Sequence, residues 1–260
     1  MSLLAQFIVY AFLFSDVFRL SAVFGVSSQM HAKLYFSALA SVVAFTVAFL
    51  LLVKSRSKPP GTRTFLYLST AAFAGGVSTV TPAVASYLYI TYPSIFFTDI
   101  TFVLYRIHFV SLPLIVLFFW LFFAQITMIK RSIVYFIAAA SVLVTFLNLI
   151  APITQEEVQL TLSVNMDIAF SLILLALWIG VFLSIAISFY YYATKQEGER
   201  RLMGFLAGTA ALFAVMIQVT NLFAFISGNP VLEASVWICA AAAFILMYFA
   251  LLPPKRLIPG

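Results

Sequence analysis

The chain has 260 residues, of which 64% are hydrophobic, 17% aromatic and 8% charged, with a net charge of +6. Soluble proteins carry about 25% charged residues, so this composition excludes a soluble globule. A helix needs about 20 apolar residues to cross a bilayer. Four stretches exceed that length without an interior Lys, Arg or Glu: Leu34–Val53, Ser132–Thr154, Asp167–Thr194 and Leu202–Leu232. The sequence therefore predicts a multi-pass membrane protein, with residues 1–260 forming a single domain.

Charges, prolines and polar clusters divide the chain into apolar segments that are too long and too continuous for barrel strands. The prediction is an all-α bundle of seven or eight transmembrane helices joined by short loops. The spans are expected at about 3–25, 34–53, 64–90, 100–128, 132–152, 165–193, 202–227 and 231–252. Ser27–Lys33 and Pro152–Gln159 are among the expected connections.

The first segment leaves the number of spans open because it carries Asp16 and Arg19. These residues are three apart, so they share a helical face and can neutralise each other. The amino end lacks the positive charge of a signal peptide, and the apolar run exceeds the usual 7–15 residues. A retained span is favoured over a cleaved or interfacial segment.

Basic residues predict the orientation, because cytoplasmic loops are rich in Lys and Arg. Eleven of the fourteen lie on alternate loops or in the tail: Lys54, Arg56, Lys58, Arg63, Lys130, Arg131, Lys195, Arg200, Arg201, Lys255 and Arg256. With Glu197 and Glu199, that side carries 11 − 2 = +9, and the remainder carries 3 − 6 = −3. The carboxyl terminus is therefore expected in the cytoplasm of a cell-membrane protein. The basic loops indicate lipid head groups as their partner, and not nucleic acid.

Charged residues inside spans are functional candidates because burying a charge in lipid is costly. Arg106, Asp167 and Glu233 lie about 33–42 Å along their helices from the basic anchors, at the outer interface. His108 lies just below Arg106, and Gln218 and Asn221 lie in the outer half of the seventh segment. These six residues form a candidate ligand-binding vestibule in which Arg106 pairs with Asp167 or Glu233. The alternative is a set of interfacial charges with one ion pair that fixes helix packing.

Small residues and prolines indicate how the helices pack and bend. Gly204 and Gly208 form a small-xxx-small pattern, which lets two helices approach closely. Asn148 is expected to hydrogen-bond a neighbouring helix. Pro82 and Pro113 mark kinks in the third and fourth segments.

No cofactor, metal site or enzymatic activity is predicted. The chain has two His and one Cys, too few for the usual metal sites. It has no G-x-S-x-G, H-E-x-x-H or Walker-type loop. The last span contains no Lys that could form a Schiff base with retinal.

The region from about residue 60 to residue 256 resembles the seven-helix amino-terminal sensor region of archaeal and bacterial histidine kinases. The resemblance rests on Arg63-Thr-Phe65-Leu-Tyr-Leu, on Tyr105-Arg106…Leu112-Pro113 leading to Phe118-Phe-Trp120, on Lys195…Arg200-Arg201-Leu202…Gly208, and on the exit Tyr248-Phe-Ala-Leu-Leu-Pro-Pro-Lys-Arg256. Because no kinase domain follows in these 260 residues, the resemblance implies a receptor-like bundle that passes its signal to a separate partner.

Two other functions remain open. The chain could be a structural or accessory subunit of a larger membrane complex, in a homo- or hetero-oligomer with other membrane chains. A small-solute transporter ranks third, because transporters have broken helices in two repeated halves. Here the interrupted spans are adjacent.

Overall fold

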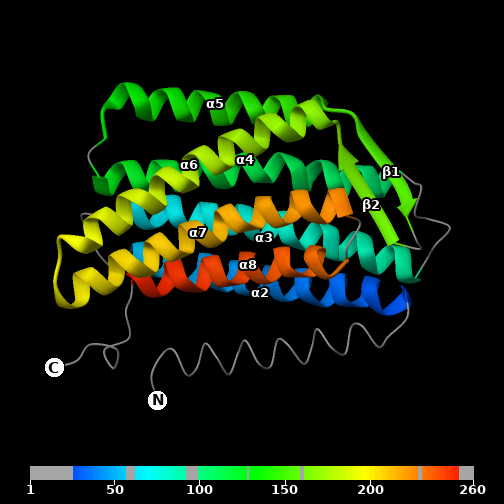
Figure 1. The fold of residues 1–260 in the computed structure, drawn as a ribbon, viewed down its shortest axis with the longest axis horizontal. Coiled ribbons are helices and arrows are strands. Elements are labelled where there is room, and N and C mark those ends of the chain that lie inside the picture. Colours follow the sequence, from blue (N-terminus) through cyan, green and yellow to red (C-terminus); the bar gives the residue numbers. More distant parts are fainter. Residues whose placement is uncertain are drawn as a thin grey trace, which may run out of the picture.

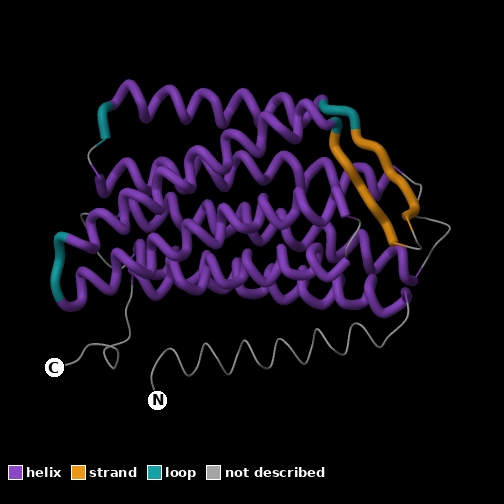
Figure 2. Tube along the Cα trace, viewed as in Figure 1, coloured by secondary structure: helices purple, strands orange, loops and turns teal. Residues whose placement is uncertain are grey.

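The computed structural model describes residues 26–56, 62–91, 99–127, 129–158, 161–227 and 230–251 as a bundle of long helices with one small sheet (Figures 1 and 2). The helices are α2 (Val26–Arg56), α3 (Thr62–Thr91), α4 (Asp99–Thr127), α5 (Arg131–Ile150), α6 (Ile168–Thr194), α7 (Gly198–Ser227) and α8 (Pro230–Leu251). Two strands, β1 (Ile153–Val158) and β2 (Thr161–Met166), join α5 to α6. The predicted helical bundle is confirmed.

Helices α2 to α7 are each long enough and apolar enough to cross a membrane. The apolar part of α8 whose side chains are described, Ser235–Leu251, is shorter. The predicted first span, at about 3–25, lies outside the described residues. The chain is thus a multi-pass membrane bundle, and a total of seven or eight spans remains a prediction.

Six of the described helices close into a ring. Each helix from α2 to α4 packs against the next, α4 also contacts α6, and α6, α7 and α8 follow in order until α8 returns to α2. Helix α5 packs mainly along α4 and lies outside this ring (Figure 1). About 72% of the α3 span is buried but only 17% of the α5 span. Helix α3 is therefore central and α5 peripheral.

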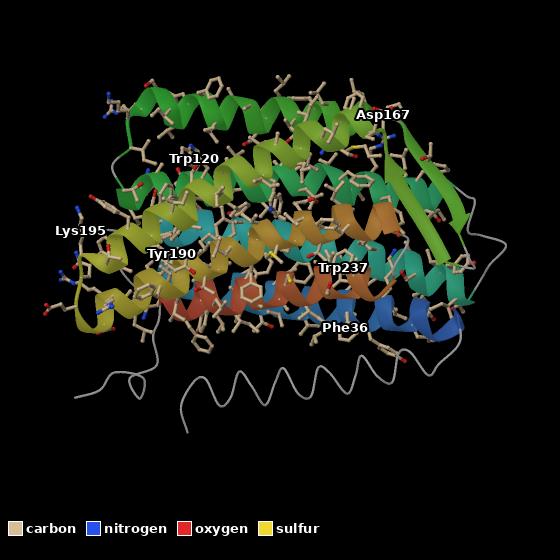
Figure 3. The ribbon with its side chains drawn as sticks, viewed as in Figure 1. Phe36, Trp120, Asp167, Tyr190, Lys195 and Trp237 are labelled. Atoms are coloured by element: carbon tan, nitrogen blue, oxygen red, sulfur yellow. The ribbon has the colours of Figure 1, made fainter. Side chains whose placement is uncertain are left out.

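The loops divide the bundle into two chemically different ends. Lys54, Lys130 and Lys195 mark what we call the basic end, where α2 stops, α4 turns into α5 and α6 turns into α7. The β-strands lie at the other end, which we call the hairpin end. Figure 3 labels Lys195 and Asp167 at the two opposite ends of α6. The basic residues of these loops thus lie at the same end of the bundle and give that end an excess of positive charge.

The predicted connection at Ser27–Lys33 is wrong, because α2 is already helical from Val26. The sequence reasoning treated Lys33 as a loop charge, yet its side chain is only 6% exposed. No proline or glycine interrupts residues 26–33, so the helix continues through them. Lys33 is therefore a buried charge.

The predicted loop at Pro152–Gln159 is also wrong, because β1 and β2 form an antiparallel hairpin there. Ile153 pairs with Met166 and Val158 with Thr161, so residues 165 and 166 belong to a strand and not to a span. The Asp167 backbone N–H donates to the Pro152 carbonyl at 3.0 Å and closes the base of the hairpin. Residues of high strand propensity, such as Thr161 and Val164, favour this structure.

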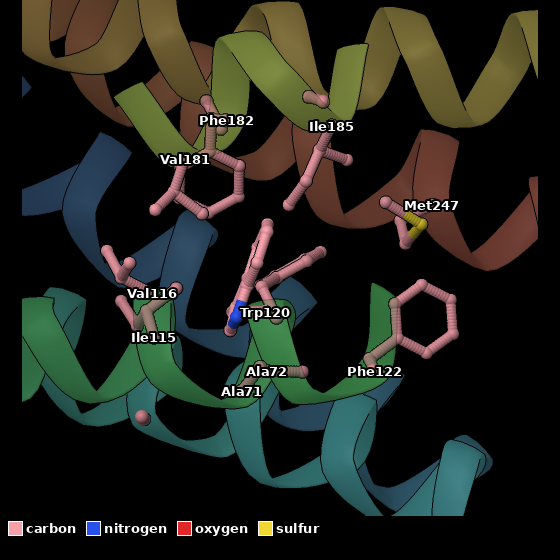
Figure 4. Packing of buried hydrophobic residues seen from close by; sticks show 14 of the residues in the cluster. Ala71, Ala72, Ile115, Val116, Trp120, Phe122, Val181, Phe182, Ile185 and Met247 are labelled. Atoms are coloured by element: carbon pink, nitrogen blue, oxygen red, sulfur yellow. The ribbon is translucent and has the colours of Figure 1, made fainter. Parts of the chain in front are cut away.

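Small and aromatic residues fill the core in complementary fashion. Ala71 and Ala72 of α3 are fully buried, and the ring of Phe182 on α6 packs against Phe119 of α4 with centroids 5.2 Å apart. Figure 4 shows Trp120 of α4 standing between its own helix and the side chains of α6. The alanine surface lets α3 lie close to its neighbours while aromatic side chains bridge α4 and α6.

Glycines allow α6 and α7 to approach closely. A Cβ atom at Gly204 would lie 2.9 Å from the Ala193 Cβ and 3.2 Å from the Phe189 carbonyl oxygen. One at Gly208 would lie 3.2 Å from the Tyr190 ring. The small-residue pattern of α7 therefore has its partner within the same chain.

Candidate functional site

The proline in α3 leaves one backbone carbonyl in need of a donor. Pro82 has no N–H, so the carbonyl of Ser78, four residues earlier, loses its normal helical hydrogen bond. The His108 Nδ1 atom of α4 lies 2.6 Å from this carbonyl oxygen. The Thr81 hydroxyl, at 3.4 Å, is a more distant donor. His108 therefore replaces the missing backbone donor from the neighbouring helix.

This contact assigns the protonation of the His108 ring. The Ser78 hydroxyl also lies 3.1 Å from Nδ1, but the carbonyl contact is shorter and a carbonyl oxygen only accepts, which assigns the hydrogen to Nδ1 and leaves Nε2 its lone pair in the neutral ring. Phe109 and Trp237 surround the imidazole, with ring centroids 5.1 Å and 6.2 Å away. His108 thus links α3 and α4, and Trp237 of α8 packs against its ring.

The proline in α4 repeats the same arrangement one helix further on. Pro113 frees the carbonyl of Phe109, again four residues earlier. The side-chain Nδ2 of Asn148 on α5 donates to this carbonyl at 2.8 Å. Asn148 is 1% exposed, and its Oδ1 has no hydrogen-bond partner in the described part of the chain. A side chain from α5 therefore satisfies the carbonyl freed in α4, as one from α4 satisfies the carbonyl freed in α3.

Arg106 of α4 forms a second connection to α5. Its Nη1 donates to the backbone carbonyls of Asn148, at 3.2 Å, and of Ala151. These carbonyls belong to the last turn of α5, where backbone oxygens lack helical donors and the helix dipole is negative. The guanidinium therefore caps α5 with both hydrogen bonds and charge.

The expected ion pair is not formed among the described residues. The Asp167 side chain is exposed and accepts a 2.9 Å hydrogen bond from the Ala169 backbone N–H, which makes it the N-cap of α6. Glu233 falls in the first turn of α8, but its side chain lies outside the described part. Arg106 and Asp167 thus lie at the same end of the bundle but serve different helix termini.

The other predicted vestibule residues separate from this group. Gln218 is buried on α7, whereas Asn221, three residues later, is exposed. Of the six candidates, Arg106 and His108 come together, and Asn148 joins them. The described side chains of Arg106, His108 and Asn148 therefore form a set of polar contacts across α3, α4 and α5. We call Ser78, Arg106, His108, Phe109 and Asn148 the carbonyl relay.

Both prolines are evident in the sequence, whereas the side chains that satisfy the freed carbonyls are not. The available signal was the position four residues before each proline, because that carbonyl must find a donor elsewhere. The sequence does not show which helix supplies the donor. It also missed the contact between the Ser41 and Thr79 hydroxyls, 2.9 Å apart, which joins α2 to α3.

Comparison with known proteins does not indicate a family or a function for this arrangement. No protein-family model, curated protein or solved structure matches the chain. Within the described residues, no group of three or more His, Cys, Asp or Glu side chains is placed to hold a metal ion. The carbonyl relay and the surrounding packing therefore carry the functional argument.

Proposed function

We propose that this chain is a non-enzymatic, receptor-like membrane bundle that passes its conformational state to a separate partner. The observation that carries the proposal is that the two prolines are connected through neighbouring residues of α4. The donor to the carbonyl freed by Pro82 is His108, and the carbonyl freed by Pro113 belongs to the next residue, Phe109. A change in α4 at this level therefore acts on α3 and α5 together.

Such a connection suits a sensor because it joins three helices at one level. Proline removes a backbone hydrogen bond and permits a bend, while the side-chain donors fix how far each helix bends. A stimulus that moves α4 near the hairpin end would change the donor geometry of His108 and Asn148 together. The resulting tilt would reach the opposite end of α3 and α4, where a partner can read it.

In this proposal the basic end faces the cytoplasm and carries the partner surface. Lys54, Lys130, Lys195 and Arg200 lie at this end, and the positive-inside rule assigns such loops to the cytoplasm. The carboxyl terminus is placed there as well. The resemblance to kinase sensor regions supports the same direction of signalling, from the hairpin end to the basic end.

A structural subunit is the second candidate, and the surface of α5 favours it. This helix lies outside the ring and exposes large apolar side chains: Tyr135, Phe136, Leu143, Phe146 and Ile150. Lipid covers such a surface, and a neighbouring membrane chain does so equally well. The transporter has no comparable observation in its favour.

Distances between spin labels at the basic end distinguish the two candidates. Labels are placed at the exposed residues Thr127 of α4 and Thr194 of α6, in a Cys239→Ala background reconstituted into lipid nanodiscs. If the chain is a sensor, the labels should show two populations of distances. Pro82→Ala should shift the protein toward one of these populations, because it restores the backbone hydrogen bond to the Ser78 carbonyl. Asn221→Leu, at an exposed position, is the control and should leave the populations unchanged. A single distance in every variant would contradict the sensor and favour the subunit.

A further inference from the structure

The α4–α5 turn carries two adjacent positive charges without a compensating acid. Lys130 and Arg131 are both exposed, and α5, which begins at Arg131, contains no acidic residue. Within the described part of the chain, no carboxylate pairs with either side chain. The turn therefore presents a compact positive surface that an anion can bind.

The α6–α7 turn, at the same end of the bundle, is different. The Lys195 ammonium donates to the Tyr191 hydroxyl and lies 4.1 Å from the centroid of that ring. Glu197 and Glu199 add two negative charges to the same turn. Of these two basic turns, the one before α5 thus keeps its positive charge available.

An apolar crevice begins next to this charge. It lies between α5 and α6, has a volume of about 220 Å³ and is lined mainly by apolar side chains: Trp120, Ile133, Ile137, Leu177, Gly180 and Val181. The hydroxyl of Ser184, on the same wall, already donates to the Gly180 carbonyl at 2.7 Å. The walls therefore suit a hydrocarbon chain.

The course of the two helices keeps the crevice open. They converge at the hairpin and separate toward the basic end (Figure 1). Gly180 is exposed, and a Cβ atom there would meet nothing within 4 Å. A molecule in the bilayer can therefore reach the space beside Gly180 from the side.

The depth of the crevice relative to the charges matches the dimensions of a membrane lipid. Ile133 and Ile137 follow Arg131 by two and six residues, which is about 3 Å and 9 Å along α5. The head-group layer on each side of the hydrocarbon core is about 5–8 Å thick. A phosphate at Arg131 would thus lie in this layer, and the chain attached to it would enter the hydrocarbon core at the level of the crevice.

We infer that the α4–α5 turn and the crevice together bind one anionic phospholipid. Lys130 and Arg131 hold its phosphate, and one of its hydrocarbon chains lies between α5 and α6 beside Gly180. A zwitterionic phospholipid brings the same chain, but the positive charge of its head group opposes the two cations. The site is separate from the carbonyl relay, and the inference holds whether the bundle is a sensor or a subunit.

The test compares two lipids that differ only in the head group: dioleoylphosphatidylglycerol and dioleoylphosphatidylcholine. The full chain is purified in a neutral detergent free of native lipid, and native mass spectrometry counts the lipids bound as each is added. Two cations at the membrane surface should raise the apparent affinity for the first phosphatidylglycerol about ten- to thirtyfold above that for phosphatidylcholine. Equal affinities would overturn the inference.

A pair of double variants locates the head group. Lys130→Gln with Arg131→Gln should reduce the affinity for phosphatidylglycerol to that for phosphatidylcholine. Arg200→Gln with Arg201→Gln removes the same charge from the same end of the bundle but away from the crevice, so it should keep the preference. Equal losses in the two double variants would mean that the lipid responds to the overall charge of this end, and the site would be wrong.

A second pair of variants locates the hydrocarbon chain. Gly180→Leu fills the crevice and should lower the affinity for both lipids about tenfold, because fewer methylene groups are buried. Leu183→Phe, at an exposed position of the same helix outside the crevice, should leave both affinities unchanged. If Gly180→Leu binds phosphatidylglycerol like the native chain, the lipid does not occupy the crevice and the inference fails.

Discussion

The His108 Nδ1 atom lies 2.6 Å from the Ser78 carbonyl oxygen, which Pro82 deprives of its helical donor. The carbonyl that a proline frees in one transmembrane helix is thus satisfied by a side chain of the next. In the same way, Asn148 Nδ2 donates at 2.8 Å to the Phe109 carbonyl, which Pro113 frees. The arrangement therefore occurs at both prolines. Several expectations about stability and dynamics depend on it.

The first prediction concerns the coupling of His108 to Pro82. His108→Phe keeps an aromatic ring but removes the donor, so the free energy of unfolding should fall by about 1–2 kcal/mol. In a Pro82→Ala background the backbone N–H can return to Ser78, and the same substitution should cost about 1 kcal/mol less. Reversible unfolding in sodium dodecyl sulfate, applied to both single variants and the double variant, measures this difference. Additive losses would show that His108 does not replace the missing donor.

The second prediction concerns Asn148, whose amide donates to the Phe109 carbonyl. Asn148→Leu preserves the side-chain volume and should lower the free energy of unfolding by about 1–2 kcal/mol. Asn148→Asp should be worse, because a carboxylate would face a carbonyl oxygen in a buried position. Asn221→Leu is the matched control on an exposed surface and should change stability by no more than about 0.5 kcal/mol. Equal losses at positions 148 and 221 would argue against a specific hydrogen bond.

The third prediction concerns Arg106 and the end of α5. Arg106→Met removes the donors to the Asn148 and Ala151 carbonyls, so hydrogen exchange of the adjacent hairpin amides should accelerate about tenfold. Arg106→Lys should be intermediate, since an ammonium keeps the charge but not the planar pair of donors. Asp167→Ala removes the N-cap of α6 and should accelerate exchange at Ala169 instead. If Arg106→Met leaves the hairpin unchanged, the guanidinium does not stabilise this end.

The fourth prediction compares glycines on α6 and α7. Gly204→Ala places a methyl group 2.9 Å from the Ala193 Cβ, so it should destabilise the bundle by about 1–3 kcal/mol. Gly180→Ala places the same group in open space and should stabilise α6 by up to about 1 kcal/mol through helix propensity. Thermal unfolding of both variants tests the contrast. The same sign at the two positions would mean that the helices are spaced differently.

Much of the fold follows from the sequence because a bilayer imposes simple rules on it. The length of the apolar runs predicts the helices, and Lys130 and Lys195 mark their turns correctly. The β-hairpin was missed because its short strands lie between two spans and resemble a loop in composition. Lys33 was assigned to a loop because a charge normally ends a span, whereas here other helices bury it.

The candidate site was predictable only in part. The cost of a charge in lipid singles out Arg106, and the structure shows that both Arg106 and His108 contact backbone carbonyls of neighbouring helices. An ion pair with Asp167 was expected because opposite charges at similar depth attract. The sequence shows that the Asn148 carbonyl lacks a helical donor, because Pro152 follows four residues later. Only the arrangement of α4 beside α5 shows that Arg106 supplies the donor.

The peripheral position of α5 also bears on how the protein assembles in the bilayer. The ring closes through the direct contact between α4 and α6, so the other six helices can pack without α5. Yet α5 precedes α6 along the chain and enters the membrane first. Because α5 packs mainly along α4 and is joined to it by Arg106 and Asn148, α5 has its principal partner in the bilayer before α6 arrives to close the ring.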